Sequence, residues 1–157
     1  MRLTSLAIFT ASTGLVAAGV VKRQSHPGPA PDASTVHCLS KSSGRPNDGD
    51  VLIRGDTDTA NDQLDAVCSK FGIFQGGSGV QRVVGNTKAF FCNHGGAIDT
   101  EECSAKWRQK FSTQITKECH LYGPGIATYT DGNMNVTYGY THKDTVIDCN
   151  FPEGQIG

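Results

Sequence analysis

The sequence lacks any apolar stretch long enough to cross a membrane, and it carries little net charge. Its longest apolar run, at residues 6–16, falls well short of the roughly 20 residues that a spanning helix needs. The 14 Lys and Arg residues are balanced by 15 Asp and Glu residues. Without a basic excess, the chain lacks the attraction that dominates nonspecific nucleic-acid binding, so we expect no nucleic-acid partner.

The spacing of cysteines that zinc sites usually need is also missing, because no two cysteines stand two to four residues apart. We therefore expect neither a metal nor a cofactor. An even number of cysteines in a small exported chain instead predicts three disulfides. The six residues are Cys38, Cys68, Cys92, Cys103, Cys119 and Cys149.

The N-terminus has the parts of a secretion signal. A positive charge at Arg2 precedes the apolar run, and small residues at 16–18 suit signal peptidase. We expect residues 1–18 to be removed as a signal peptide, which predicts a secreted, extracellular protein.

A dibasic pair, Lys22 and Arg23, follows the signal directly. It is similar to the sites that Kex2-type proteases of the fungal Golgi cut, which predicts a propeptide at 19–23 and a mature chain beginning at Gln24. Loss of these two residues and of Arg2 leaves 11 basic and 15 acidic residues. The resulting charge of about −4 argues against a lytic basic peptide and leaves a membrane receptor open as a partner.

The mature chain opens with residues 24–35, which hold three of the six prolines and no large apolar residue. This composition predicts a flexible arm. Residues 36–157 then form a single disulfide-rich domain, which we expect to be a monomer. A domain of this size buries a core of its own, and disulfides add to its stability outside the cell.

The first half of the domain is expected to contain a strand, a helix and a hairpin. Residues 51–54 predict a short strand, and a helix capped by Thr57 or Thr59 should end before Gly72. Runs at 81–84 and 88–92 flank Gly and Asn, which predicts a hairpin. The helix has one apolar stripe, made of Ala60, Leu64, Val67, Cys68 and Phe71.

A second helix is predicted from the acidic, capping run at 99–102 through Cys119. Its stripe recurs every fourth residue, at Cys103, Trp107, Phe111, Ile115 and Cys119. A continuous helix would separate the first and last of these by about 24 Å, too far for a disulfide. Removing that bond leaves 12 of the 15 possible connectivities for six cysteines.

After this helix the residue pattern again alternates with a period of two, as in a strand, at 126–130 and at 135–141. Two such runs joined by a turn predict a second hairpin. Residues 146–147 are expected to add a short edge strand. The order predicts an α+β fold, with an antiparallel sheet of four to five strands and two helices packed on one face, an α/β plait.

Several side chains have two interpretations. Asp62 and Asp65 share the first helix as a hydrolase pair would, although solvation of an exposed helix is the simpler explanation. Tyr138 and Tyr140 fall on one face of a strand, and form an exposed aromatic patch if that face points away from the helices. Asn135 begins the sequon Asn-Val-Thr, which predicts N-glycosylation just past a turn.

The secretion signal, dibasic site, even cysteine count and β-α-β-β-α-β order together resemble small cysteine-rich secreted effectors of plant-associated filamentous fungi. Residues 131–140 (DGNMNVTYGY) are similar in style to the closing hairpin of the KP4 killer toxins, and the chain loosely resembles killer toxins with a KP4/KP6-type α/β fold. Those toxins have more cysteines and a glycine-cysteine pattern that this chain lacks. The resemblance therefore implies a virulence-associated lifestyle but transfers no toxin residue.

Residues 79–86 and 94–97 resemble two segments of small fungal guanyl-specific ribonucleases. The match implies that Arg82 stabilises a phosphate and that His94 acts as general acid. That family also needs a catalytic Glu before the Arg, and no glutamate precedes Glu101. In that fold, moreover, the helix precedes these segments, whereas the long predicted helix of this chain follows His94.

The sequence thus favours a secreted, non-enzymatic effector that binds a host or competitor protein. An extracellular ribonuclease-like enzyme and a killer-type toxin acting on a membrane channel are the alternatives.

Overall fold

The computed structural model describes residues 28–39, 51–71, 73–147 and 149, and these form an α+β domain. The main sheet has five strands in the order β1-β6-β7-β4-β3, all antiparallel. Its strands are β1 (Thr35–Cys38), β3 (Ser78–Val84), β4 (Thr87–Asn93), β6 (Gly125–Asp131) and β7 (Met134–His142). Two short strands, β2 (Ile73–Phe74) and β5 (Ile98–Asp99), pair separately.

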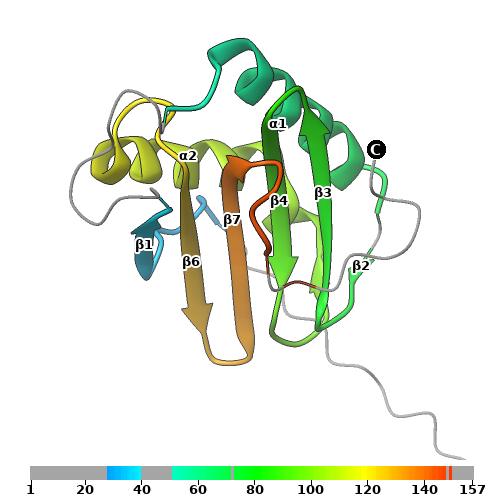
Figure 1. Cartoon of the computed structure of the whole chain (residues 1–157). Coiled ribbons are helices and arrows are strands. Elements are labelled where there is room, and N and C mark those ends of the chain that lie inside the picture. Colours follow the sequence, from blue (N-terminus) through cyan, green and yellow to red (C-terminus); the bar gives the residue numbers. More distant parts are fainter. Residues whose placement is uncertain (1–27, 40–50, 72, 148, 150–157) are drawn as a thin grey trace, which may run out of the picture.

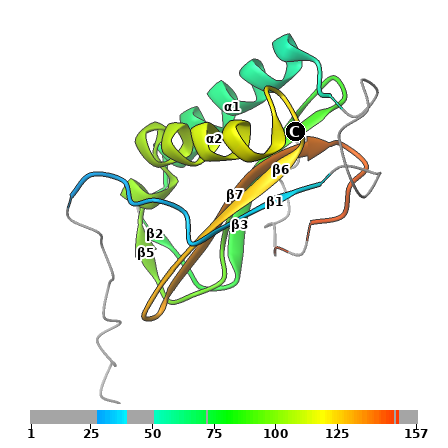
Figure 2. The ribbon, with the colours of Figure 1, turned by 90° about the vertical axis from the view of Figure 1, so that its left-hand side faces the viewer.

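Two helices, α1 (Arg54–Cys68) and α2 (Ala105–Cys119), lie side by side on one face of the sheet (Figures 1 and 2). The predicted fold class is therefore confirmed. Because strand side chains alternate, one set from each strand meets the helices and forms the core. The predicted stripe of α2 is buried, with Trp107 against Phe111 and Tyr129 at centroid distances of 5.7 and 5.5 Å.

Both predicted hairpins are present, as β3–β4 and β6–β7. The first turn depends on Gly85, whose φ is +54°, a value that side chains rarely adopt. A Cβ there would also stand 2.0 Å from a carboxylate oxygen of Asp56. That same Asp56 carboxylate accepts a hydrogen bond from the Asn86 backbone N–H at 3.1 Å, so the turn is attached to the first turn of α1.

The strand predicted at 51–54 is wrong, because Arg54 already begins α1 and residues 51–53 pair with no strand. Leu52 alone of the three is buried, and its N–H donates to the Tyr122 carbonyl at 3.0 Å. A single backbone hydrogen bond to a loop is not the series of hydrogen bonds that defines a paired β-strand. The sheet takes its edge strand instead from β1, where Val36 lies opposite Ala127 of β6.

The second helix begins later than predicted. Thr100–Cys103 is a 3-10 helix (η2), and Ser104 is extended, with ψ of 162°. The continuous helix from 99 to 119 is therefore wrong, although the exclusion of a Cys103–Cys119 bond is confirmed. The three disulfides are Cys38–Cys119, Cys68–Cys103 and Cys92–Cys149, with Cα separations of 5.3, 5.5 and 5.8 Å.

Of the arm predicted at 24–35, the structure describes residues 28–35, and these lie against α2. The Ala33 N–H donates to the Gln114 side chain at 2.8 Å, and Asp32 pairs with Lys110 at 2.8 Å. Ala30 and Ala33 are half-buried against the core. The signal peptide, the propeptide, Lys22 and Arg23 lie outside the described residues.

Candidate functional site: a pocket on the open face of the sheet

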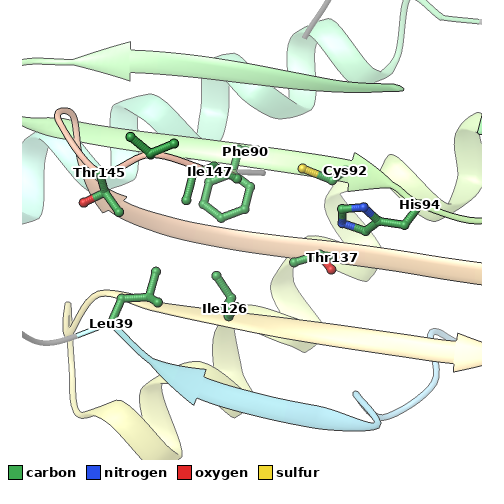
Figure 3. A pocket seen from close by; sticks show the side chains of 9 residues that line it. Leu39, Phe90, Cys92, His94, Ile126, Thr137, Thr145 and Ile147 are labelled. Atoms are coloured by element: carbon green, nitrogen blue, oxygen red, sulfur yellow. The ribbon is translucent and has the colours of Figure 1, made fainter. Parts of the chain in front are cut away.

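The face of the sheet opposite the helices carries a pocket of about 320 Å³ (Figure 3). Its floor comes from three adjacent strands, with Ile126 on β6, Thr137 on β7, and Phe90 and Cys92 on β4. We call this the open-face pocket. Its lining residues are Leu39, Phe90, Cys92, His94, Ile126, Thr137, Thr145, Val146 and Ile147.

The middle strand has no side chain at the centre of this floor, so the side chains of Phe90 and Ile126 close over it. Gly139 of β7 lies between Phe90 and Ile126 in the sheet register. A Cβ at Gly139 would stand 2.7 Å from ring atoms of Phe90 and from the Ile126 side chain. An isolated glycine inside a strand pattern is a known sign of close approach, and it was the one sequence signal for this site.

One wall of the pocket is formed by the segment after β7, which we call the strap and define as residues 143–147 together with Cys149. Lys88 Nζ donates to the Thr145 carbonyl at 2.8 Å, and the Lys143 N–H donates to the Asn86 carbonyl at 3.0 Å. Cys149 is bonded to Cys92. Burial lowers the pKa of Lys88, partly offset by the Asp144 carboxylate.

The edge strand predicted at 146–147 is wrong, because these residues lie over the face of the sheet and not along its edge (Figure 3). The reason is covalent: Cys92 belongs to β4, which lies between β7 and β3. A segment bonded to an interior strand is held over the face. Phe90 is fully buried as a result, although it points away from the helices.

The two ends of the open-face pocket differ in polarity. His94 and Thr137 lie at one end, Leu39 and Thr145 lie at the other, and Phe90, Ile126 and Ile147 lie along the middle (Figure 3). His94 is exposed, and it is the one titratable side chain in the lining, since Cys92 is held in a disulfide. The pocket is therefore suited to an apolar group with a polar end.

The ribonuclease-like candidates Arg82 and His94 are not brought together. Arg82 lies opposite Ala89 in the β3–β4 register, on the face that meets the helices, and its guanidinium donates to the Gln81 carbonyl at 2.7 Å. His94 lines a pocket on the other face. A phosphate held by the Arg82 guanidinium would thus have the sheet between itself and His94.

Of the aromatic and acidic candidates of the sequence, the two tyrosines belong to the core and one of the two aspartates belongs to an ion pair. Tyr138 and Tyr140 are each 2% exposed and face the helices, so they form no surface patch. Asp65 accepts two hydrogen bonds from Arg108, both at 2.7 Å, whereas Asp62 is exposed.

The sequon residue Asn135 is the second residue of β7 and is half-buried. Its Oδ1 is buried and has no hydrogen-bond partner among the described residues. The backbone carbonyl of Asn135 accepts a hydrogen bond from the backbone N–H of His94 at 2.7 Å. The sequon therefore lies beside the polar end of the open-face pocket. Glycosylation there stays a prediction.

In comparisons with known proteins, the chain matches no family model, no curated protein and no solved structure. Within the described part of the chain, no group of three or more His, Cys, Asp or Glu side chains is arranged to hold a metal ion. Neither described helix is long and apolar enough to cross a membrane. The three disulfides are compatible with a secreted protein.

Proposed function

We propose that the protein is a secreted effector that acts outside the producing cell by binding a host or competitor target. The open-face pocket receives an apolar group of that target, whose polar end lies beside His94 and Thr137. The observation that carries this proposal is the pocket itself, a largely apolar hollow of about 320 Å³ with His94 and Thr137 at one end. Sites of this size and polarity are typical of ligand recognition.

The make-up of the pocket favours binding over catalysis. A side-chain nucleophile is usually activated by a base within hydrogen-bond reach of it. Of the lining side chains, His94 alone carries an acid–base group, and Arg82 lies on the opposite face. The disulfides, the secretion signal and the dibasic site support export as the setting in which this binding takes place.

The proposal predicts that filling the pocket abolishes binding. We expect Ile126→Trp to weaken binding of the probe anilinonaphthalene sulfonate, which has apolar rings and one anionic end, by at least about tenfold. Ile53→Trp is the matched control, because Ile53 is 62% exposed and lies outside the pocket. Fluorescence titration measures both dissociation constants, and unfolding temperatures verify that both variants fold.

The same two variants test the biological role on host tissue or on a competing microorganism. We expect the Ile126→Trp protein to lose its effect and the Ile53→Trp protein to keep it. Equal activity of the two would separate the effector role from the pocket. Cleavage of RNA by the purified protein, lost on changing His94→Ala, would replace the binding proposal with the ribonuclease alternative.

A further inference from the structure

A second, smaller pocket lies between the two helices, on the other side of the sheet from the open-face pocket. It has a volume of about 140 Å³, and its floor includes Tyr140 of β7. We call it the interhelical pocket. Its lining residues are Thr57, Asp58, Asn61, Arg108, Ser112, Thr116, Leu121, Tyr122 and Tyr140, and all but Leu121 carry a polar side-chain group.

The charges around the interhelical pocket are already balanced. Arg108 makes its two 2.7 Å bonds to Asp65, which neutralises the guanidinium. Asp58 is 3.6 Å from the Arg54 guanidinium and accepts the Tyr122 hydroxyl at 3.2 Å. An anion in this pocket would find the Arg108 guanidinium already paired, and it would be repelled by the Asp58 carboxylate. A neutral polar ligand fits this balance better than an ion of either sign.

The lining offers several hydrogen-bonding groups at once. The hydroxyls of Tyr140, Ser112 and Thr116 line the pocket together, and each of these three hydroxyls is both a donor and an acceptor. Asn61 uses its Oδ1 to accept the Tyr138 hydroxyl at 2.8 Å, which leaves its amide N–H groups outside that bond. Hydroxyls together with planar amide and carboxylate groups match the paired donors and acceptors of adjacent sugar hydroxyls.

The mouth of the pocket is formed by a loop with unusual backbone angles. His120 and Tyr122 have φ of 67° and 59°, in a region that costs energy for residues with side chains. This conformation places Tyr122 and the 65% exposed Leu121 at the rim. An aromatic ring and an exposed aliphatic group beside polar groups suit the C–H face of a sugar ring. The Cys38–Cys119 bond fixes the chain directly before this loop.

From these observations we infer that the interhelical pocket binds one unit of a neutral saccharide. The lining hydroxyls, Asn61 and Asp58 bond to the sugar hydroxyls, and Tyr122 with Leu121 packs on its apolar face. This inference rests on a site separate from the open-face pocket, so it stands or falls independently of the proposed effector target.

The test uses the full mature protein and chitotetraose, cellotetraose, laminaritetraose and mannotetraose as probes, with inorganic phosphate as the anionic comparison. Saturation-transfer NMR detects binding and calorimetry measures affinity. We expect Asp58→Asn/Thr116→Val to weaken saccharide binding by at least about tenfold, since one hydrogen bond is lost and a charge-assisted bond becomes neutral. The matched control is Asp62→Asn/Thr113→Val, one exposed residue on each helix outside the pocket.

We expect the wild-type protein and the control variant to bind at least one of the four oligosaccharides with equal affinity. Thr116→Val alone, which conserves side-chain volume, replaces the double variant if that variant does not fold. Three results would overturn the inference: no binding of any of the four oligosaccharides, binding of phosphate in their place, or a pocket variant that binds as tightly as the control.

Discussion

At the scale of single residues, the space between the helices and the sheet is occupied by a polar network inside an apolar core. The Tyr138 hydroxyl donates to Asn61 and also contacts Arg108, which is in turn bonded to Asp65. The four side chains come from β7, α1 and α2. Because buried polar groups are costly unless paired, this network fixes how the two helices lie on the sheet.

Changing Tyr138→Phe should lower the free energy of unfolding by about 1–3 kcal/mol, because the buried Asn61 oxygen loses its donor. The substitution should also reduce the alkaline sensitivity of the fold. Burial raises the pKa of Tyr138, against a smaller opposite effect of Arg108. The folded protein therefore keeps a proton that the unfolded chain releases above about pH 10, so stability falls as pH rises beyond that value.

Urea unfolding at pH 7 and at alkaline pH measures both effects of Tyr138→Phe. Tyr122→Phe is the control, since the bond between its hydroxyl and Asp58 is exposed, and we expect a cost below about 1 kcal/mol. An unchanged alkaline slope in the Tyr138→Phe protein would show that other groups govern the loss of stability.

At the scale of elements, the sequence predicted those parts of the fold that local periodicity determines. The stripe of α2 and the two hairpins have strong repeating patterns and are present. The segments at 51–53 and 146–147 are short apolar runs, whose conformation depends on distant partners. Leu52 is attached to the loop at Tyr122, and the strap is held by Cys149. Neither partner is visible in a local window.

The candidate sites follow the same division. The cysteines were identified correctly as bonded, but spacing alone left 12 pairings open. The open-face pocket combines Gly139, three strands and the strap, and the interhelical pocket needs both helices and β7. Such sites arise from the register and from helix placement, which no motif in the chain encodes.

The strap predicts a local effect of removing one disulfide. We expect Cys92→Ala/Cys149→Ala to speed hydrogen exchange at the Thr145 amide and to weaken binding of the anilinonaphthalene probe, because the pocket loses a wall. Cys68→Ala/Cys103→Ala is the control. Rings of 57 and 35 residues give nearly the same chain-entropy stabilisation, about 4 kcal/mol each.

The two cysteine variants should therefore lose similar global stability, while only the variant without Cys92–Cys149 should lose protection at the pocket. Hydrogen exchange of β4 and β7 amides measures the global stability, and exchange of the Thr145 amide measures the local protection of the strap. Equal protection of Thr145 in both variants would mean that the strap stays on the sheet without its disulfide.

At the scale of the whole molecule, the three disulfides cross-link β1, both helices, η2, β4 and the strap. Cys38–Cys119 holds β1 and the end of α2, Cys68–Cys103 joins the end of α1 to η2, and Cys92–Cys149 holds the strap. The first ring spans 81 residues and encloses the second, so their effects overlap and do not simply add. Even so, the stabilisation of one ring is comparable with the 5–15 kcal/mol net stability of ordinary domains.

Reduction of all three bonds should therefore unfold the protein under conditions in which the oxidised form is stable. We expect the oxidised protein to show one cooperative thermal transition by near-ultraviolet circular dichroism, and the reduced protein to have lost that signal at 37 °C. Reoxidation should restore the signal, whereas alkylating the reduced thiols should prevent its return. A reduced chain with an unchanged transition would be stable in a reducing cytosol as well, and the disulfides would then no longer support export as the condition for folding.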